Sequence, residues 1–331
     1  MICFSLQDTE VLTMLKVVTS PTAPASAGAT ENRPQIWAVA SGKGGVGKSF
    51  IASNLGLALA QSGRRTIVVD LDLGGANLHT HLGMSRPKHS LSHFINGKRS
   101  DLKEMIESLP GTTLGIISGA SDHLEVANLK HFQKLKLIRH LYKLPADNVI
   151  LDLGAGTTYN TLDFFNIADQ GILSVIPEPT SIENSHRFLK SAMYRKLRDV
   201  PVDTKEIVKE ILGKPTEQTR SLNTLNKIIA SIHQKSAKHG KILRKKINSA
   251  GLHLIVNQIR EPSDFQLGYS MALIWKQYYG KKPDSLSFLN HDASIMKALC
   301  EHQMYLHEHP HSRNAIQLKH LVKSIIHQQQ S

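Results

Sequence analysis

The most constraining feature of this 331-residue sequence is a glycine-rich segment between two apolar runs. The segment spans residues 41–49 and reads Ser-Gly-Lys-Gly-Gly-Val-Gly-Lys-Ser. The apolar run at 36–40 before it predicts a strand, and Ile51, Leu55 and Leu59 after it have helical spacing. A strand, a glycine-rich turn and a helix in this order are the context that a phosphate-binding loop requires, and a merely solvated turn does not need that context.

The glycines explain how such a loop holds a phosphate. Without Cβ atoms, they let backbone N–H groups approach phosphate oxygens, and the free N–H groups at the helix start add partial positive charge. In this pattern Lys48 is expected to reach the β- and γ-phosphates, and the Ser49 hydroxyl to ligate Mg²⁺. The residues expected to bind the nucleotide here are Gly42, Gly44, Gly45, Val46, Gly47, Lys48, Ser49 and Phe50.

A second lysine narrows the class of protein. Lys43 follows the first glycine, a position where the ordinary loop pattern does not require a lysine. The run Gly-Lys-Gly-Gly-Val-Gly-Lys-Ser resembles the deviant Walker A motif of the MinD/ParA family of dimerising ATPases. The resemblance implies that ATP bridges a homodimer and that Lys43 reaches the nucleotide of the partner subunit. The spacing alone indicates only a positive charge beside the phosphates.

Two aspartates follow the next apolar run. Residues 66–70 are typical of a buried strand, and Asp70 and Asp72 leave its carboxyl end, where ligands bind in open α/β sheets. Two carboxylates this close usually need a cation or a function, which disfavours a solvated turn. The segment 70–78 also resembles the switch I region of the MinD/ParA family. That resemblance implies that Asp72 positions the attacking water.

A third element reads Asn-Val-Ile-Leu-Asp-Leu-Gly-Ala-Gly at residues 148–156. An apolar strand that ends in Asp152 fits the Walker B requirement for a carboxylate beside Mg²⁺. Gly154 gives the backbone freedom beside the γ-phosphate, as a switch II loop needs, and the pattern resembles the Asp-x-x-Gly of the family. Ser49 and Asp152 are therefore the expected magnesium ligands.

Two further segments extend the resemblance. Residues 177–181, Pro-Glu-Pro-Thr-Ser, look like the MinD-like branch, above all the ATPases that set flagellar number and placement. The apolar run at 252–257 ends in Asn257, where the family often has Asn-Arg and where the asparagine contacts adenine. An amide can donate to adenine and accept from it at once. Gln258 replaces the usual arginine, so only Asn257 carries the expected adenine contact.

Composition limits the setting of the protein. The net charge is +13, which favours anionic partners such as nucleic acid or acidic lipid, although it also simply aids solubility. The two cysteines, Cys3 and Cys300, are far apart, which disfavours a disulfide framework or an iron–sulfur site. No apolar run approaches the about 20 residues of a membrane span, and the first residues lack the basic start of a signal peptide. The expected location is the cytoplasm, with peripheral attachment at the inner membrane left open.

Four segments outside the three motifs indicate how the rest of the chain is organised. Residues 1–34 predict a tail and linker, either disordered or a short peptide that folds onto a partner. Residues 200–250 are helical in pattern and basic, and predict an insertion for partner contact, for DNA phosphates or simply for a solvated face. The cations of the 129–142 helix are expected on a solvated face. The amphipathic end at 315–326 is expected to pack on the core rather than to bind a membrane.

The sequence thus predicts a three-layer α/β P-loop NTPase of the SIMIBI type, with a mostly parallel sheet and helices on both faces, over residues 35–330. The predicted activity is Mg²⁺-dependent ATP hydrolysis, with Lys43, Lys48 and Asp72 as catalytic residues, ATP and ADP as ligands and turnover stimulated by a protein partner. The leading role is a dimerisation switch that positions a cellular structure, with flagellar placement favoured. The alternatives are a ParA-like DNA-partition ATPase and a nucleotide-binding scaffold with little hydrolysis.

Overall fold

The computed structural model describes residues 33–119, 129–197, 200–212 and 224–330. Almost all of the expected tail at 1–34 lies outside these residues. Arg33, at the start of the described chain, pairs with Asp169, with Nη2 and Oδ1 2.8 Å apart. In the part of the chain that the structure describes, no helix is both long and apolar enough to cross a membrane.

The described chain forms one eight-stranded sheet with the order β3-β4-β2-β5-β1-β6-β7-β8. Every neighbouring pair is parallel except β3 and β4, which are antiparallel. The strands are β1 (Gln35–Ala40), β2 (Thr66–Leu71), β3 (Glu107–Ser108), β4 (Leu114–Ile117), β5 (Asn148–Leu153), β6 (Gln170–Val175), β7 (Gly251–Ile259) and β8 (Ser285–Asn290).

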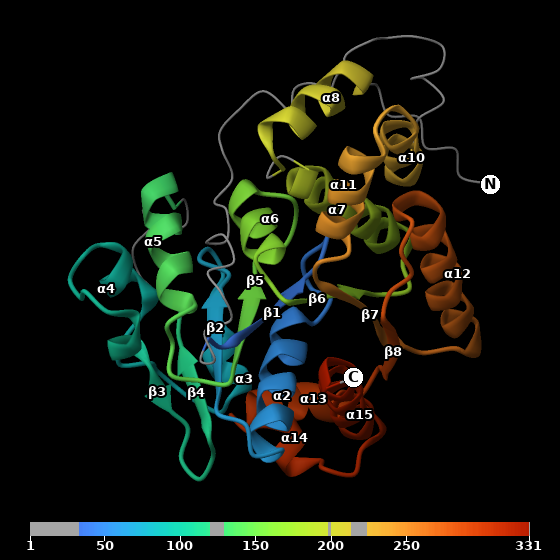
Figure 1. Cartoon of the computed structure of the whole chain (residues 1–331). Coiled ribbons are helices and arrows are strands. Elements are labelled where there is room, and N and C mark those ends of the chain that lie inside the picture. The colour runs from blue at the N-terminus through green and yellow to red at the C-terminus, as the bar shows by residue number, and fades with distance from the viewer. Residues whose placement is uncertain (1–32, 120–128, 198–199, 213–223, 331) are drawn as a thin grey trace.

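Helices cover both faces of this sheet (Figure 1). On the face of the glycine-rich loop helix lie α2 (Lys48–Gln61), α3 (Leu78–His81), α13 (Ala293–Cys300), α14 (Tyr305–Glu308) and α15 (Arg313–Gln330). The other face carries α4 (Leu91–Ile95), η1 (Leu102–Met105), α5 (His131–Leu141), α6 (Tyr159–Asn166), α7 (Pro179–Lys196), α8 (Val202–Leu212), α10 (Leu225–Lys235), α11 (Ala237–Ile247) and α12 (Pro262–Tyr279).

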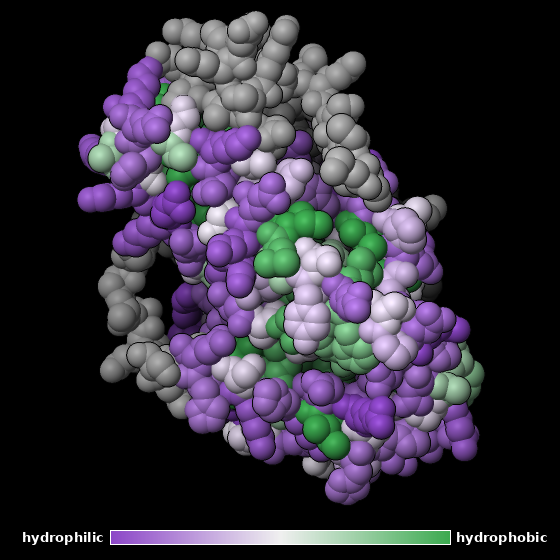
Figure 2. All heavy atoms as spheres, turned by 90° about the vertical axis from the view of Figure 1, so that its right-hand side faces the viewer, coloured by the Kyte–Doolittle hydropathy of each residue, from purple (hydrophilic) through white to green (hydrophobic). Residues whose placement is uncertain are grey.

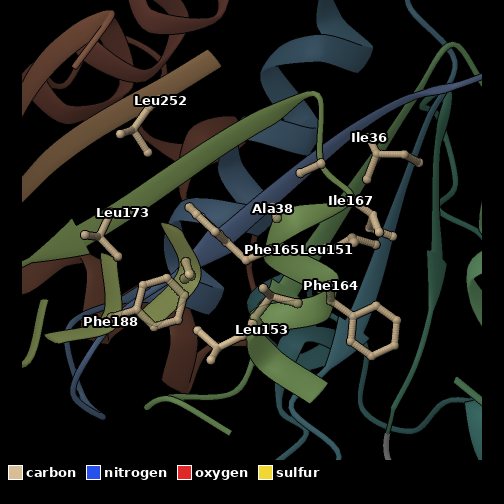
Figure 3. Packing of buried hydrophobic residues seen from close by; sticks show 14 of the residues in the cluster. Ile36, Ala38, Leu151, Leu153, Phe164, Phe165, Ile167, Leu173, Phe188 and Leu252 are labelled. Atoms are coloured by element: carbon tan, nitrogen blue, oxygen red, sulfur yellow. The ribbon is translucent and has the colours of Figure 1, made fainter. Parts of the chain in front are cut away.

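Alternation along the strands divides the core between the two faces. On β1, Ile36, Ala38 and Ala40 join the cluster under α5, α6 and α7, whereas Trp37 and Val39 join the cluster under α2 and α15. Successive strand side chains point to opposite faces, so a strand buried on both sides is apolar throughout. Figure 3 shows the packing of the first cluster, where side chains of α6 and α7 meet those of β1, β5 and β6. The predicted three-layer fold is confirmed.

The final helix packs on the core, as expected. Leu318, Leu321, Val322 and Ile325 of α15 are buried in the same cluster as α2. Ile316 is the exception among the apolar residues of that stretch, because its side chain is 55% exposed.

The basic region at 200–250 forms the helices α8, α10 and α11 among its described residues. Ile228, Ile229 and Ile232 of α10 are buried in the main cluster, and Leu243 and Ile247 anchor α11 there. These helices therefore carry an apolar face against the body of the protein and a basic face outside. That this region is an insertion relative to other members of the family stays a prediction.

Helix α12 presents an apolar face to solvent. Figure 2 shows hydrophobic side chains gathering on this side of the molecule. Phe265, Tyr269, Leu273 and Ile274 of α12 are exposed, while Met271 and Trp275 on its other side are buried. Phe265 and Tyr269 also contact the ring of Phe288 on β8.

A buried histidine on β7 makes the stability of the fold depend on pH. His253 Nε2 lies 2.8 Å from Gln170 Oε1, and its Nδ1 lies 2.8 Å from the Ser285 hydroxyl. Burial lowers the pKa of His253 to about 4, against the raising effect of Asp284 and with a smaller lowering by Lys281. In the unfolded chain the same imidazole titrates near about 6.5.

We expect the free energy of unfolding to fall as the pH drops from about 6.5 to about 4. In this range His253 binds a proton in the unfolded chain but stays neutral in the folded chain. The contribution of His253 is about 3 kcal/mol over this range. The variant His253→Gln keeps an N–H donor toward Gln170 and should show a flatter pH profile in urea unfolding. A variant profile parallel to that of the wild type would contradict this assignment.

Candidate nucleotide site

The glycine-rich loop lies at the carboxyl end of β1 and leads into α2. Gly45 and Gly47 have positive φ angles of 76° and 87°, which glycine adopts without strain. Gly47 precedes the first turn of α2, whose first N–H groups have no acceptor within the helix. These N–H groups and the left-handed turns form a concave loop of donors, which is the geometry that binds phosphate oxygens.

Two buried polar side chains hold the backbone of the glycine-rich loop in place. The Ser174 hydroxyl of β6 donates to the carbonyl of Val46 at 3.1 Å, and Asn257 Nδ2 donates to the same carbonyl at 2.9 Å. The Asn257 Oδ1 accepts from the Gln258 N–H at 2.9 Å, and the residue is only 4% exposed. In this structure Asn257 therefore positions the loop, and its contact with adenine stays a prediction.

Gly42 is the tightest backbone approach of the loop. A Cβ atom at this residue would lie 2.1 Å from the carbonyl carbon of Asn184 and 2.5 Å from the N of Ser185, both backbone atoms of α7. Gly44 differs, because a Cβ there would meet nothing within 4 Å and its φ is not positive. The first glycine thus packs the loop against α7.

We expect Gly42→Ala to lower the free energy of unfolding by at least about 2 kcal/mol, because helix backbone cannot yield as a flexible side chain can. The matched change Gly44→Ala should shift it by less than about 1 kcal/mol. Urea unfolding without nucleotide measures both. Equal effects at the two positions would show that packing against α7 does not set the requirement for glycine.

Lys48, Ser49 and Asp152 meet at the start of α2 and the end of β5. The Lys48 side chain is buried, as is Asp152 at 1% exposure. Burial raises the pKa of Asp152 to about 7, against the lowering effects of the neighbouring Ser49 hydroxyl and of the Lys48 charge. Both carboxylate oxygens of Asp152 are buried without a hydrogen-bond partner.

An unpartnered buried carboxylate is costly unless a cation or donor completes its surroundings. A carboxylate and a hydroxyl are both oxygen ligands, which Mg²⁺ prefers. The residues present therefore fit a magnesium ion beside the phosphates, held through Ser49 and Asp152 as the sequence predicts.

The two aspartates at the carboxyl end of β2, Asp70 in the strand and Asp72 just after it, have different surroundings. Asp70 is fully buried and accepts hydrogen bonds from the N–H groups of Asp72 and Leu78, both at 3.1 Å, so it holds the loop that follows. Burial, with a smaller effect of Asp152, raises the pKa of Asp70. Asp72 is partly exposed and lies beside Gly154, where a Cβ would be 3.3 Å from Asp72 Oδ1.

The loop after β5 also contacts the glycine-rich loop. The Gly156 N–H donates to the carbonyl of Ser41 at 3.1 Å. The structure thus brings Asp72 and Gly154 together, and ties the segment after Asp152 to the start of the phosphate-binding loop. This is the arrangement that the order of the three motifs predicts.

Phe50 contributes differently from the loop residues before it. Its ring is buried and packs edge-to-face against Tyr305, with the centroids 5.2 Å apart. Only its backbone N–H, in the first turn of α2, is placed to face a phosphate.

Lys43 is held within its own subunit. Its Nζ donates to Glu178 Oε2 at 2.6 Å and to the Thr180 hydroxyl at 3.3 Å. Both partners belong to the Pro-Glu-Pro-Thr-Ser segment at 177–181, which resembles the MinD-like branch in the sequence. The pairing itself was not predicted, and a single sequence carries no signal for a contact across 135 residues.

A buried ion network, which the sequence did not predict, lies next to the segments that follow β2 and β5. Lys134 of α5 and Arg195 of α7 both bind the carboxylate of Asp163 on α6. All three side chains are buried, at 6%, 9% and 2% exposure respectively. The expectation that the cations of the 129–142 helix form a solvated face is therefore wrong for Lys134, because its carboxylate partner comes from a different helix.

The fold and this site define a P-loop nucleotide-binding protein whose loop carries an additional lysine. Residues 37–305 match the CobQ/CobB/MinD/ParA nucleotide binding domain, and the chain belongs to this family.

Two curated proteins that resemble this chain are FleN and YlxH. The antiactivator FleN of Pseudomonas aeruginosa is 36% identical over 158 residues, which are 47% of this chain and 55% of FleN. The flagellum site-determining protein YlxH of Helicobacter pylori is 33% identical over 156 residues, 46% of this chain and 52% of YlxH. The chain thus spans about half the length of the curated relatives it matches.

Solved structures support the fold. The septum site-determining protein MinD of Pyrococcus horikoshii, complexed with Mg-ADP, has a TM-score of 0.60 at 20% identity, covering 88% of this chain and 96% of that chain. The predicted resemblance to the MinD-like flagellar regulators is confirmed at the level of family and relatives.

Proposed function

We propose that this protein is a Mg²⁺-dependent ATPase that works as a dimerisation switch. The observation that carries the proposal is the convergence of three motifs on adjacent strands. The glycine-rich loop and Asp72 follow β1 and β2, and Asp152 lies at the carboxyl end of β5; these three strands are neighbours in the order β2-β5-β1. The likeness to MinD/ParA ATPases and to a MinD that was solved with Mg-ADP supports ATP and ADP as the ligands.

The chemistry of such a site is mostly positioning and charge stabilisation. The loop N–H groups and Lys48 hold the phosphates, and Ser49 and Asp152 hold Mg²⁺, which when bound neutralises charge on the phosphate oxygens. Asp72 orients the attacking water at the mouth of the site, beside the backbone of Gly154. Lys43 leaves Glu178 and stabilises charge in the site of the partner subunit.

The role we favour is placement or number control of flagella. YlxH, whose name describes a flagellum site-determining protein, supports it, and FleN is named an antiactivator, which suits a regulatory role. ATP would then join two copies, the dimer would bind a protein partner or an anionic surface in the cytoplasm or at the inner membrane, and hydrolysis would release it. The tail at 1–34 and the region at 200–250 are the segments that we propose for such contacts.

A ParA-like role in DNA partition is a second candidate, supported by α11. Lys238, Lys241, Arg244 and Lys245 on this helix are exposed, and the chain carries a net charge of +13. Filter binding with duplex DNA separates the two roles. ATP-dependent retention that weakens with salt supports partition, while absence of retention from a protein that still dimerises removes it.

The dimerisation switch is tested by light scattering with Mg-ATP, with Mg-ADP and without nucleotide. We expect a dimer mass only with Mg-ATP, and a monomer mass for Lys43→Ala under the same conditions. A monomer with Mg-ATP would contradict the proposal. A phosphate-release assay with candidate partners, lipid vesicles and DNA then separates an active switch from a scaffold with little hydrolysis.

The Lys43–Glu178 pair predicts a tunable dimer affinity. Because Lys43 of each subunit must leave Glu178 before it crosses the interface, Glu178→Gln should tighten the Mg-ATP dimer by up to about thirtyfold, since two exposed ion pairs are broken per dimer and each contributes at most about 1 kcal/mol. Glu183→Gln, in the helix α7 that begins just after Glu178, is the matched control; Glu183 pairs with Arg187, and the change should leave the dimer affinity unaltered. A weaker dimer in Glu178→Gln would mean that Glu178 assists assembly instead.

A further inference from the structure

A second cavity lies beside the switch segments, on the face that carries α5, α6 and α7. Its volume is about 670 Å³, and its walls come from residues 71–74 after β2, residues 153–161 around the start of α6, and parts of α5 and α7. None of the loop residues 42–49 lines it. The cavity is therefore separate from the phosphate-binding loop, and its volume is in the range of cavities that hold small organic ligands.

The walls of this cavity are apolar on one part and cationic on another. Leu71, Leu129, Leu153 and Phe164 provide the apolar part. The cationic part consists of Lys134 and Arg195, with His131 at the end of the same wall. Asp72 contributes a carboxylate where the cavity approaches the nucleotide site.

The cationic wall carries one more positive charge than its buried carboxylate balances. Lys134 and Arg195 share Asp163, which accepts from Lys134 Nζ, from Arg195 Nε and, at 2.9 Å, from Arg195 Nη2. A guanidinium has five N–H donors and an ammonium has three, so one carboxylate uses only part of this set. Asp72 supplies a carboxylate elsewhere in the lining, so an added anion is expected at the cationic wall, where it would balance the second cation and accept charge-assisted hydrogen bonds.

We propose that this cavity binds a small amphipathic organic anion, with a single carboxylate or sulfonate group on an apolar body. The anionic group faces Arg195 and Lys134, and the apolar body lies against Leu71, Leu153 and Phe164. The apolar walls disfavour inorganic phosphate, which would leave them without a partner.

The position of the cavity couples such a ligand to the switches. Asp72 and Gly154 line it and lie beside each other, and both belong to the segments that we propose to respond to the γ-phosphate. A ligand that sets the conformation of these segments changes the affinity for nucleotide, and by thermodynamic linkage the nucleotide changes the affinity for the ligand. Binding of the ligand requires no ATP hydrolysis. The ligand site can therefore be tested independently of the proposed ATPase activity.

The test uses 8-anilinonaphthalene-1-sulfonate, a fluorescent amphipathic anion, and its uncharged analogue N-phenyl-1-naphthylamine. We expect saturable binding of one sulfonate per chain, at least tenfold tighter than binding of the uncharged dye. Arg195→Gln should weaken the sulfonate at least fivefold and leave the uncharged dye unchanged. This variant keeps the Lys134–Asp163 pair balanced, and Lys134→Met, which keeps the Arg195–Asp163 pair, is the second variant.

The exposed apolar face of α12 is the competing site for both dyes, so Leu273→Ser is the matched control. It should leave the sulfonate affinity unchanged. The proposal is overturned if Leu273→Ser abolishes binding, if the two dyes bind equally well, or if neither cation variant weakens the sulfonate. A shift of sulfonate affinity between nucleotide-free and Mg-ADP-bound protein would support the coupling, and the same affinity in both states would remove it.

Discussion

Steady-state ATP hydrolysis is expected to fall at least about a hundredfold when Asp72 is replaced by alanine, while Mg-ATP binding and the Mg-ATP dimer persist. The structure gives the reason for this separation. Asp72 lies beside Gly154, whereas the loop glycines, Lys48 and the Ser49–Asp152 pair are the groups that we propose to hold the nucleotide and its metal. Replacing Asp72 is therefore expected to remove the group that we propose to orient water without removing a phosphate or metal contact.

The control for this change is Asp147→Ala, at the opposite end of the strands. Asp147 pairs with Arg65 on the surface, with Oδ1 and Nη2 2.9 Å apart. Phosphate release by this variant should stay within about twofold of the wild type, because surface changes distant from a site rarely alter it. If Asp72→Ala hydrolysed ATP at the wild-type rate, or lost the nucleotide altogether, the role assigned to Asp72 would be wrong.

Asp163→Asn is expected to lower the free energy of unfolding by about 3–5 kcal/mol. The change keeps the shape of the side chain but leaves two buried cations, Lys134 and Arg195, without a countercharge. Three helices meet at this carboxylate, so the loss affects the packing of α5, α6 and α7 together. Urea unfolding followed by circular dichroism measures the effect.

A triple variant separates charge from packing. In Asp163→Leu with Lys134→Met and Arg195→Met, all three charges are absent, and a well-packed apolar replacement often recovers the stability of a buried ion network. We therefore expect the triple variant to be more stable than Asp163→Asn. A loss below about 1 kcal/mol in Asp163→Asn would show that solvent reaches the two cations and that their burial is not what makes the carboxylate necessary.

The fold could be predicted from the sequence because its decisive elements are local. The loop at 41–49 follows an apolar strand, and the aspartates of β2 and β5 lie at or just beyond the carboxyl ends of apolar strands. Parallel strands place their carboxyl ends at one edge of the sheet, so the order of the motifs along the chain already implied that they meet.

What could not be predicted depends on pairs distant in the sequence. Lys134 reads as one of several helical cations, and only the packing of α5 against α6 reveals that it is buried against Asp163. The same holds for Asn257, whose amide is satisfied by the carbonyl of Val46, 211 residues away. Helical periodicity describes the face of one helix, and it carries no information about the partner that the face meets.

The central claim is that the glycine-rich loop, Lys48, Ser49 and Asp152 form a site for a magnesium-bound nucleoside triphosphate. Titration calorimetry with Mg-ATP tests it most directly, with Lys48→Ala as the paired variant. We expect one nucleotide bound per chain in the wild type and at least a hundredfold loss of affinity in the variant. Absence of binding to the folded wild-type protein, or equal binding by the variant, would contradict it.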